Sequence, residues 1–272
     1  MALSTEITFT DLLSTRFAPI QDALMALLDP LDNVALMLTS KKINENVNQK
    51  LKAGQYNINA RLQPFFRDPR AFRSMQAHCS AFISSVFAHC FFIESIRCPG
   101  LLLYVGQDVD AMLRYLEAEG YVEATSKTSG NGEDAPSYKR YEKCGPEGSK
   151  FIIGVLSSHR QSAVQMALHS ECLTGGLTFI AWNKACHMLP CTVLVKKEIY
   201  LLCDSADREL ELRFFSQEGI KIKSVHWNAY EKIRPKDCQL LTRLRRIGDK
   251  HTWTMPLDTV GVTPSPHTRL RT

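Results

Sequence analysis

The sequence lacks any apolar run long enough to cross a membrane, because no stretch approaches the roughly 18 uninterrupted apolar residues that a spanning helix needs. The first ten residues also lack a charged region followed by an apolar core, which is the pattern of a secretory signal. We therefore expect no membrane insertion and no secretion, and we expect a protein of the cytoplasm or nucleus.

The chain also lacks the compact motifs of metal and phosphate chemistry. No paired Cys-x-x-Cys knuckle occurs, and Gly175-Gly176 is a turn dipeptide without the other residues of a phosphate-binding loop. The densest set of potential zinc ligands has a spacing that matches no standard zinc pattern: His169, Cys172, Cys186, His187 and Cys191. We expect no metal, no cofactor and no catalytic residue, with a small zinc-stabilised interaction domain as an alternative.

Outside the C-terminal end of the chain, positive and negative residues nearly balance. The net charge is +5 over 272 residues, and a surplus of about five basic residues lies from Arg234 onward. Aromatic residues are not interleaved with these basic residues, so they indicate a solvated terminus and we do not expect nucleic-acid binding. The 44% apolar and 22% charged composition is that of a folded protein. The nine cysteines are odd in number and scattered among apolar residues, which favours mostly reduced, buried thiols.

Apolar residues recur at near-helical spacing in the first fifth of the chain, and Pro30 interrupts them. This pattern predicts two or three short helices between residues 17 and 51 that form a helical hairpin with its own apolar stripe. The stripe consists of Ile20, Leu24, Leu27, Leu28, Val34, Leu36, Leu38 and Ile43.

The region after residue 64 has mixed periodicity. A proline-containing connection at 64–70 precedes a crowded apolar run at 71–92, which predicts one buried helix. The next segments predict a central strand at 101–105 and an amphipathic helix at 108–119 that ends at Gly120, as in a βαβ-like unit. Further expectations are strands at 138–143 and 150–156, a helix at 177–186, and a disordered Thr- and Pro-rich tail from 254.

Residues 17–43 resemble an F-box. The specific part is an Asp-Pro-Leu-Asp break at residues 29–32 that leads into Ala-Leu-Met-Leu-Thr-Ser-Lys at residues 35–41. The start departs from the family pattern, because Phe17-Ala18-Pro19 stands where the family usually has Leu-Pro. The resemblance implies that this module docks on the adaptor subunit of a ubiquitin ligase through an apolar face.

Residues from Phe65 to about Leu201 resemble fungal proteins that often follow an F-box-like head and look like degenerate nucleotidyltransferases. The resemblance is carried by residues 66–74, 83–88, 101–105 and 168–170. In an active nucleotidyltransferase, a Gly-Ser turn holds the nucleotide phosphates, and two Asp residues on the following strand bind metal ions. Here the Gly-Ser position is Ser85-Val86, and the strand that should read Asp-x-Asp reads Gly100-Leu101-Leu102. The resemblance therefore implies the fold without the activity.

We expect an α+β protein with a short N-terminal helical F-box-like head at 1–60, a mixed-sheet nucleotidyltransferase-like body at 61–250 and a disordered basic tail at 251–272. The expected role is non-catalytic: the body presents a surface to an unknown protein partner, and the head binds the F-box adaptor, which would make the chain a substrate-recognition subunit. The adaptor-binding residues are predicted to be Pro19, Leu24, Leu27, Leu36 and Leu38. The alternative is a divergent nucleotidyltransferase or nucleotide-binding pseudoenzyme, with metal ligands at positions such as Asp108, Asp110 or Glu94.

Overall fold

The computed structural model divides the chain into two compact units, residues 1–57 and residues 58–272, which we call the head and the body. It describes residues 7–28, 30–37, 39–43, 45–47, 56–93, 98, 100–128, 136–158, 160–202, 209–224, 247–249 and 251–264. No helix among these residues is long and apolar enough to cross a membrane.

The head is helical, with α1 (Phe9–Leu12), a 3₁₀ turn (Thr15–Phe17), α2 (Ala18–Leu27) and α3 (Pro30–Met37). Thr8 and Asp11 form a capping box that satisfies the first N–H groups of α1. Pro19 lies in the first turn of α2, where its missing N–H costs nothing. The buried Gln21 side chain donates from Nε2 to the Leu13 carbonyl oxygen at 2.7 Å, which ties α2 to the segment before it.

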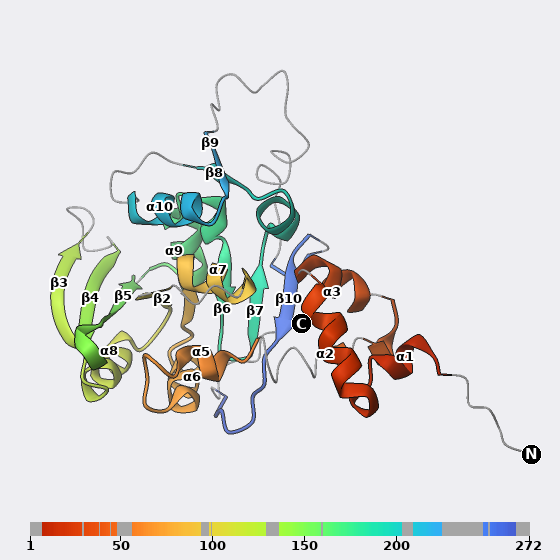
Figure 1. Cartoon of the computed structure of the whole chain (residues 1–272). Coiled ribbons are helices and arrows are strands. Elements are labelled where there is room, and N and C mark those ends of the chain that lie inside the picture. Colours follow the sequence, from red (N-terminus) through yellow and green to blue (C-terminus); the bar gives the residue numbers. More distant parts are fainter. Residues whose placement is uncertain are drawn as a thin grey trace, which may run out of the picture. The chain divides into compact units, whose positions relative to one another are not determined.

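The body is built on a mixed eight-stranded sheet with the strand order β10-β7-β6-β1-β2-β5-β4-β3 (Figure 1). The only parallel pair among these strands is β2 with β5, and every other neighbouring pair is antiparallel. Its strands are β1 (Phe82–Ser84), β2 (Gly100–Val105), β3 (Val122–Thr128), β4 (Ser137–Cys144), β5 (Lys150–Ser157), β6 (Thr178–Ile180), β7 (Lys184–His187) and β10 (Trp253–Pro256). A separate parallel pair consists of β8 (Glu198–Leu201) and β9 (Lys221–Ser224). The expected α+β class is confirmed.

Helices surround this sheet: α5 (Ile58–Leu62), α6 (Pro69–His78), α7 (Ser85–Ile93), α8 (Val109–Ala118), α9 (Ala163–Ser170) and α10 (Glu209–Gln217). Two 3₁₀ turns lie at Pro146–Gly148 and Thr174–Gly176, and a π-helix lies at Cys191–Val195. The helix starts follow from local chemistry, since Asp68 and Ser162 accept N–H groups of the first turns of α6 and α9. Gly120, with φ +91°, follows α8 and continues the chain where a residue with a Cβ would be strained.

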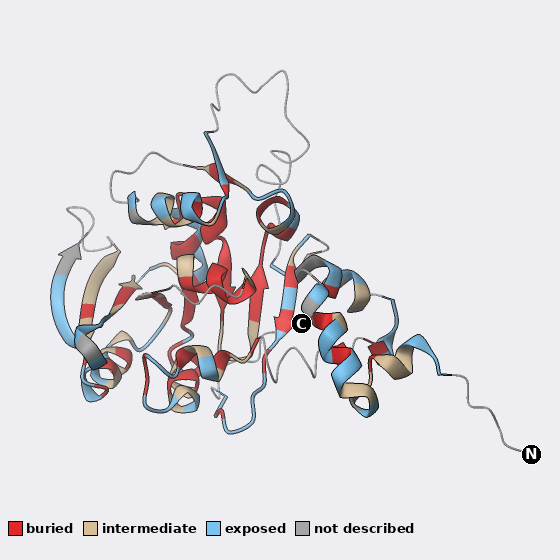
Figure 2. Cartoon of the chain, viewed as in Figure 1, coloured by how far each residue is buried: buried red, intermediate tan, exposed pale blue. Residues whose placement is uncertain are grey.

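The core of the body is concentrated around β1, β6, β7 and α7, which Figure 2 colours as buried, whereas β3 at the sheet edge is largely exposed. Phe82 and Tyr104 are register partners on β1 and β2, and their ring centroids lie 5.4 Å apart. The same cluster includes Met166 of α9 and Phe215 of α10. One apolar layer therefore joins the central strands to the helices that follow them in the sequence.

Two helix expectations in the body are wrong. The run at 71–92 is α6, β1 and α7 instead of one helix, because Ile83 pairs with strands on both sides. Residues 177–186 include β6 and β7 instead of a helix. The strands β1 and β6 in these segments are buried at every residue, and a short apolar run in such a place gives the same sequence signal as a helix.

The βαβ-like expectation is also wrong, because β3 pairs antiparallel with β4 and does not lie beside β2. The parallel neighbour of β2 is β5, with Leu102 opposite Gly154. The strands predicted at 101–105, 138–143 and 150–156, and the helix at 108–119, are confirmed.

The expectation of a disordered tail from residue 251 is wrong for residues 251–264. Trp253 and Met255 are buried in β10, which pairs with β7 along the sheet edge. The fully buried guanidinium of Arg73 on α6 donates to the carbonyl oxygens of Trp182 and Asp258. The C-terminal strand is thus held by backbone pairing and by a buried cation, which the Thr- and Pro-rich composition does not indicate.

Candidate functional site

The junction of β1 and α7 is the place where the resemblance puts a phosphate-binding turn. β1 ends at Ser84, and Ser85 opens α7 with φ +65°, a left-handed conformation that a residue other than glycine rarely adopts. The fully buried Ser84 Oγ lies 2.9 Å from the Gly176 carbonyl oxygen, 3.1 Å from that of Thr178 and 3.3 Å from Glu171 Oε1. The first serine of the junction is therefore held inside the body.

Glu171 is the carboxylate nearest to this serine. It caps the end of α9 and is only 2% exposed. The Tyr104 hydroxyl of β2 donates to Glu171 Oε1 at 3.1 Å and lies 2.7 Å from Ser170 Oγ. A buried carboxylate is tolerated where hydrogen bonds replace water, and these hydroxyl groups supply them at Oε1.

The second serine of the junction meets a carboxylate from another helix. Ser85 Oγ donates to Glu211 Oε1 of α10 at 2.6 Å, and Ser85 is 6% exposed. The pair joins the start of α7 to α10, which is 126 residues away in the chain. An anion such as a phosphate would have to displace this carboxylate before it could reach the Ser85 hydroxyl.

Space around the junction is taken up by protein atoms. A Cβ added to Gly176 would overlap the Glu171 carboxylate, and one added to Gly175 would lie 2.6 Å from the Phe215 ring. The Gly175-Gly176 pair, expected to be a turn, forms a 3₁₀ turn whose glycines allow Glu171 and Phe215 to approach closely. Glycine serves internal packing here.

The strand opposite the junction carries no carboxylate. Leu102 of β2 is the register partner of Ser84, and its side chain packs against the apolar core cluster. Gly100 precedes it by two positions on the same side of the strand. The two positions at which the resemblance requires Asp are therefore a glycine and an apolar side chain.

The carboxylates considered as relocated metal ligands do not lie at this junction. Because β1 and β2 are antiparallel, Ser84 faces the beginning of β2, whereas Asp108 follows its far end. Asp108 caps α8 and lies 2.8 Å from His78 Nε2, a contact that lowers the pKa of Asp108. Asp110 lies in the first turn of α8, and Glu94 lies outside the described residues.

The residues of the possible zinc set are not gathered into one site. Among the described residues, no group of three or more His, Cys, Asp or Glu side chains could hold a metal ion. Cys172 is disulfide-bonded, and Cys186 Sγ lies 3.7 Å from Thr254 Oγ1. His187 Nδ1 accepts the Leu189 backbone N–H at 3.3 Å within the core.

Two histidines form a buried pair beside the junction. His89 of α7 and His187 of β7 are fully buried, with ring centroids 6.1 Å apart. Burial lowers the pKa of His89 to about 4, and it lowers the pKa of His187 in the same direction. Both rings are therefore neutral at pH 7 and act as core side chains.

The chemistry available at the junction is limited by its burial. Ser84 and Tyr104 bond Glu171 Oε1 away from solvent, so a substrate has no access to them in this conformation. Sequence reasoning missed Glu171 and Glu211, because neither lies in a motif and both reach the serines only through tertiary folding.

The predicted adaptor-binding residues lie on two helices of the head. Pro19, Leu24 and Leu27 are on α2, where Pro19 is exposed, Leu24 is half-buried and Leu27 is 82% exposed. Leu36 on α3 is half-buried, and Leu38 lies outside the described residues. Ile20, seven positions before Leu27 and hence on the same side of α2, is 44% exposed.

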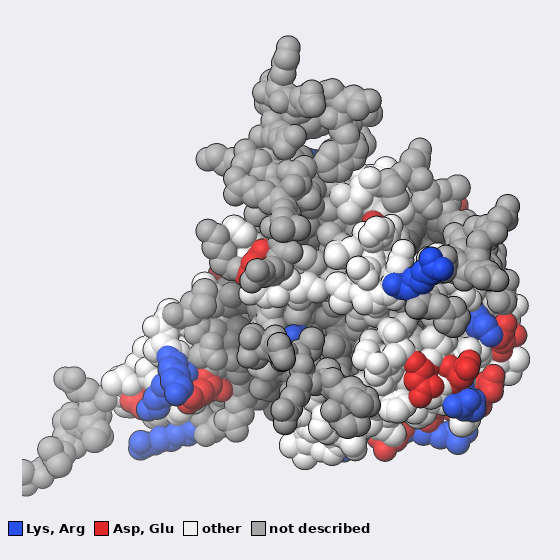
Figure 3. All heavy atoms as spheres, turned by 180° about the vertical axis from the view of Figure 1, so that it is seen from behind, with Lys and Arg blue, Asp and Glu red and all other residues white. Residues whose placement is uncertain are grey.

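Charged side chains on the face of the body drawn in Figure 3 are interspersed instead of forming one basic stripe. Ion pairs at the β3–β4 end of the sheet include Lys139 with Glu123 at 3.1 Å and Arg140 with Glu142 at 2.7 Å. These paired charges leave little local excess of either sign.

No family model matches the chain, and no curated protein matches it.

Proposed function

We propose that this chain is a non-catalytic protein-interaction protein whose F-box-like head binds the F-box adaptor of a ubiquitin ligase, while its nucleotidyltransferase-like body presents a surface to an unknown protein partner. The observation that carries the proposal is the exposed apolar side of α2. Such a chain would serve as a substrate-recognition subunit.

One side of α2 carries the exposed Ile20 and Leu27 and the half-buried Leu24, at positions i, i+7 and i+4. Gln21 and Met25 of the same helix are buried and point to a different side of it. Leu27 lies away from this buried side and is 82% exposed, so most of its surface is in water. Covering an apolar side chain of this size stabilises a complex by roughly 1.5–3 kcal/mol, so a partner that covers the stripe gains free energy.

The non-catalytic part of the proposal rests on the β1–α7 junction. The Ser85 hydroxyl donates a hydrogen bond to Glu211, and Leu102 and Gly100 lie at the positions where metal-binding carboxylates would be needed. Because the Ser85 hydroxyl is engaged and metal-binding carboxylates are missing at positions 100 and 102, the junction lacks groups that would neutralise the charge that develops on a transferred phosphoryl group.

The test is co-purification of the full-length protein with the F-box adaptor of its own host. Ile20→Asp and Leu27→Asp each place a carboxylate on the exposed stripe, and neither removes a side chain from the core of the head. A matched control is Ser40→Asp, an exposed change that adds the same charge and keeps an oxygen able to accept the Ile43 N–H. Circular dichroism establishes that every variant is folded.

We expect the wild type and Ser40→Asp to retain the adaptor, and Ile20→Asp and Leu27→Asp to lose it. Wild-type protein that does not bind the purified adaptor at micromolar concentration contradicts the adaptor-binding role. Equal binding by all four proteins places the contact elsewhere and contradicts the assignment to α2.

A second candidate is a nucleotide-binding pseudoenzyme, and it is favoured by the left-handed backbone of Ser85 at the start of α7. A ligand that binds only the folded state raises the midpoint of thermal unfolding. We expect no increase with millimolar nucleotide and magnesium. An increase that is enhanced in Glu211→Gln, which weakens the contact with Ser85, would favour this second candidate instead.

A further inference from the structure

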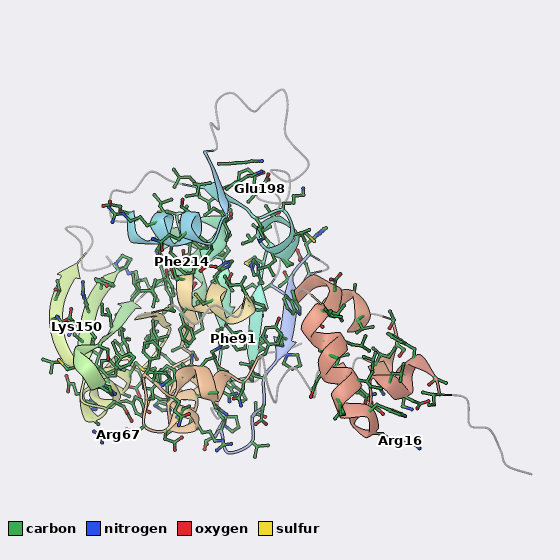
Figure 4. The ribbon with its side chains drawn as sticks, in the orientation of Figure 1. Arg16, Arg67, Phe91, Lys150, Glu198 and Phe214 are labelled. Carbon is green, nitrogen blue, oxygen red and sulfur yellow. The ribbon has the colours of Figure 1, made fainter. Side chains whose placement is uncertain are left out.

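A pocket in the body contains two thiols side by side. It has a volume of about 210 Å³ and is lined by Ala60, Arg61, Pro64, Phe65, Phe87, Cys90, Phe91, Cys98 and Phe151. Phe91, labelled in Figure 4, extends from α7 toward the interior of the body. Cys90 lies one residue before it on α7, and Cys98 precedes β2.

The two cysteines differ in exposure but are in direct contact. Cys90 is 3% exposed, whereas Cys98 is of intermediate exposure, and neither forms a disulfide. The Cys90 side chain hydrogen-bonds to the Cys98 sulfur, and this contact lowers the pKa of the Cys98 thiol against the opposing effect of burial. The Cys98 thiol also lies 3.1 Å from the Gly100 carbonyl oxygen.

We propose that Cys90 and Cys98 form a redox-active dithiol in the wall of this pocket, which a hydroperoxide converts to an intramolecular disulfide. The partly exposed Cys98 reacts first and the buried Cys90 completes the bond. This property is independent of the function proposed above, since neither thiol lies on α2 or at the Ser85–Glu211 contact.

The step balances as two thiols and one hydroperoxide. The Cys98 thiolate attacks the peroxide, so that its sulfur gains a hydroxyl, the O–O bond breaks and hydroxide, or the alcohol of an organic peroxide, leaves. The Cys90 sulfur then attacks the Cys98 sulfur, an S–S bond forms, and hydroxide leaves and takes up the thiol proton as water. Each cysteine sulfur gives up one electron, and the peroxide is reduced by two.

The surroundings of this pair differ from those of the other described cysteines that form no disulfide. Cys79 is fully buried and its pKa is raised to about 11 by burial, and burial also raises the pKa of Cys186, so neither is readily ionised at pH 7. Cys144 and Cys191 are exposed. Only Cys98 combines access from outside with a thiol neighbour in the wall of the same pocket, among the cysteines that the structure describes.

The test is peptide mapping of the reduced full-length protein after treatment with hydrogen peroxide and blocking of the remaining thiols. Trypsin cleaves after Arg97, so the disulfide joins the peptides 74–97 and 98–114. Cys79 shares the first peptide with Cys90, and the experiment therefore includes Cys79→Ser. We expect the joined pair in the wild type, in Cys79→Ser and in Cys144→Ser, a matched exposed control, and its absence in Cys90→Ala and Cys98→Ser.

A second readout does not depend on disulfide formation. Alkylation of Cys98 by iodoacetamide at pH 7 should slow several-fold in Cys90→Ala, because the thiolate loses its hydrogen-bond donor, and should be unchanged in Cys144→Ser. The proposal is overturned if the peptides 74–97 and 98–114 stay separate in the oxidised wild type. It is also overturned if their linkage requires Cys79 instead of Cys90.

Discussion

Two apolar helices, α2 in the head and α7 in the body, differ in how much of their surface their own unit covers. Seven of the nine residues of α7 are buried, on all sides of the helix. In α2 the buried side carries Gln21 and Met25, while Ile20 and Leu27 are exposed. An apolar helix that its own unit covers contributes mainly to stability, whereas one with an open apolar side is available to a partner.

The largest expected effect on stability comes from truncating a buried side chain of α7. Phe92 is fully buried and packs edge-on against the rings of Phe91, His187 and Trp253. Phe92→Ala should lower the free energy of unfolding of the body by about 3–5 kcal/mol, since it removes transfer free energy and leaves a cavity. Urea unfolding followed by circular dichroism measures the loss. A change below 1 kcal/mol would mean that α7 is not the core helix described here.

The next effect is a pH dependence that originates in α7. Burial lowers the pKa of His89 from 6.5 to about 4, so between these values the unfolded chain takes up a proton that the folded protein does not. Stability is therefore fully present above pH 6.5 and falls as the pH drops toward 4, by about 3 kcal/mol for this residue. Urea unfolding at pH 7 and pH 4.5 should show a smaller difference in His89→Phe than in the wild type. The exposed His251→Phe should leave the difference unchanged.

A smaller effect is expected at the buried side of α2. Gln21 is 1% exposed and bonds the Leu13 carbonyl oxygen, so Gln21→Leu leaves that carbonyl without its donor. The head should lose about 1–3 kcal/mol. Hydrogen exchange of amides in residues 9–27 reports on the head specifically, and faster exchange confined to these residues is the expected result. Slower or unchanged exchange would show that the contact contributes little.

The smallest effect on stability is expected at the open side of α2. Leu27→Asp should change the free energy of unfolding by no more than about 0.5 kcal/mol, because an exposed side chain loses little packing. The same urea experiment as for Phe92→Ala measures it. A loss of several kcal/mol would show that Leu27 is covered in solution, and the contrast between α2 and α7 would then disappear.

Sequence reasoning was most accurate where one local signal dominated. The strand at 101–105 has a short apolar run bounded by Pro99-Gly100, and the helix at 108–119 has a capping Asp108 and a terminal Gly120. It was wrong at 71–92 and 177–186, where the short strands β1 and β6 are buried at every residue and lack the alternation that distinguishes strand from helix. The Thr- and Pro-rich composition of 251–264 likewise concealed β10, which depends on pairing with β7.

Some features of the β1–α7 junction can likewise be predicted from the sequence, and others cannot. That residues 85 and 86 are Ser and Val, and that residues 100–102 carry no carboxylate, can be read from the chain alone. That Glu171 and Glu211 bond the two serines cannot, because the partners of these bonds are 87 and 126 residues apart and no local pattern encodes them.

The sequence by itself determined the α+β class, the helical head and the absence of carboxylates at positions 100–102, since these depend on residue identity and local spacing. Tertiary structure alone decided which side of α2 is open, where the last strand lies, and which carboxylates reach the β1–α7 junction. The physical reason is that burial and hydrogen bonding between distant segments depend on how the whole chain folds back on itself, which local periodicity does not contain.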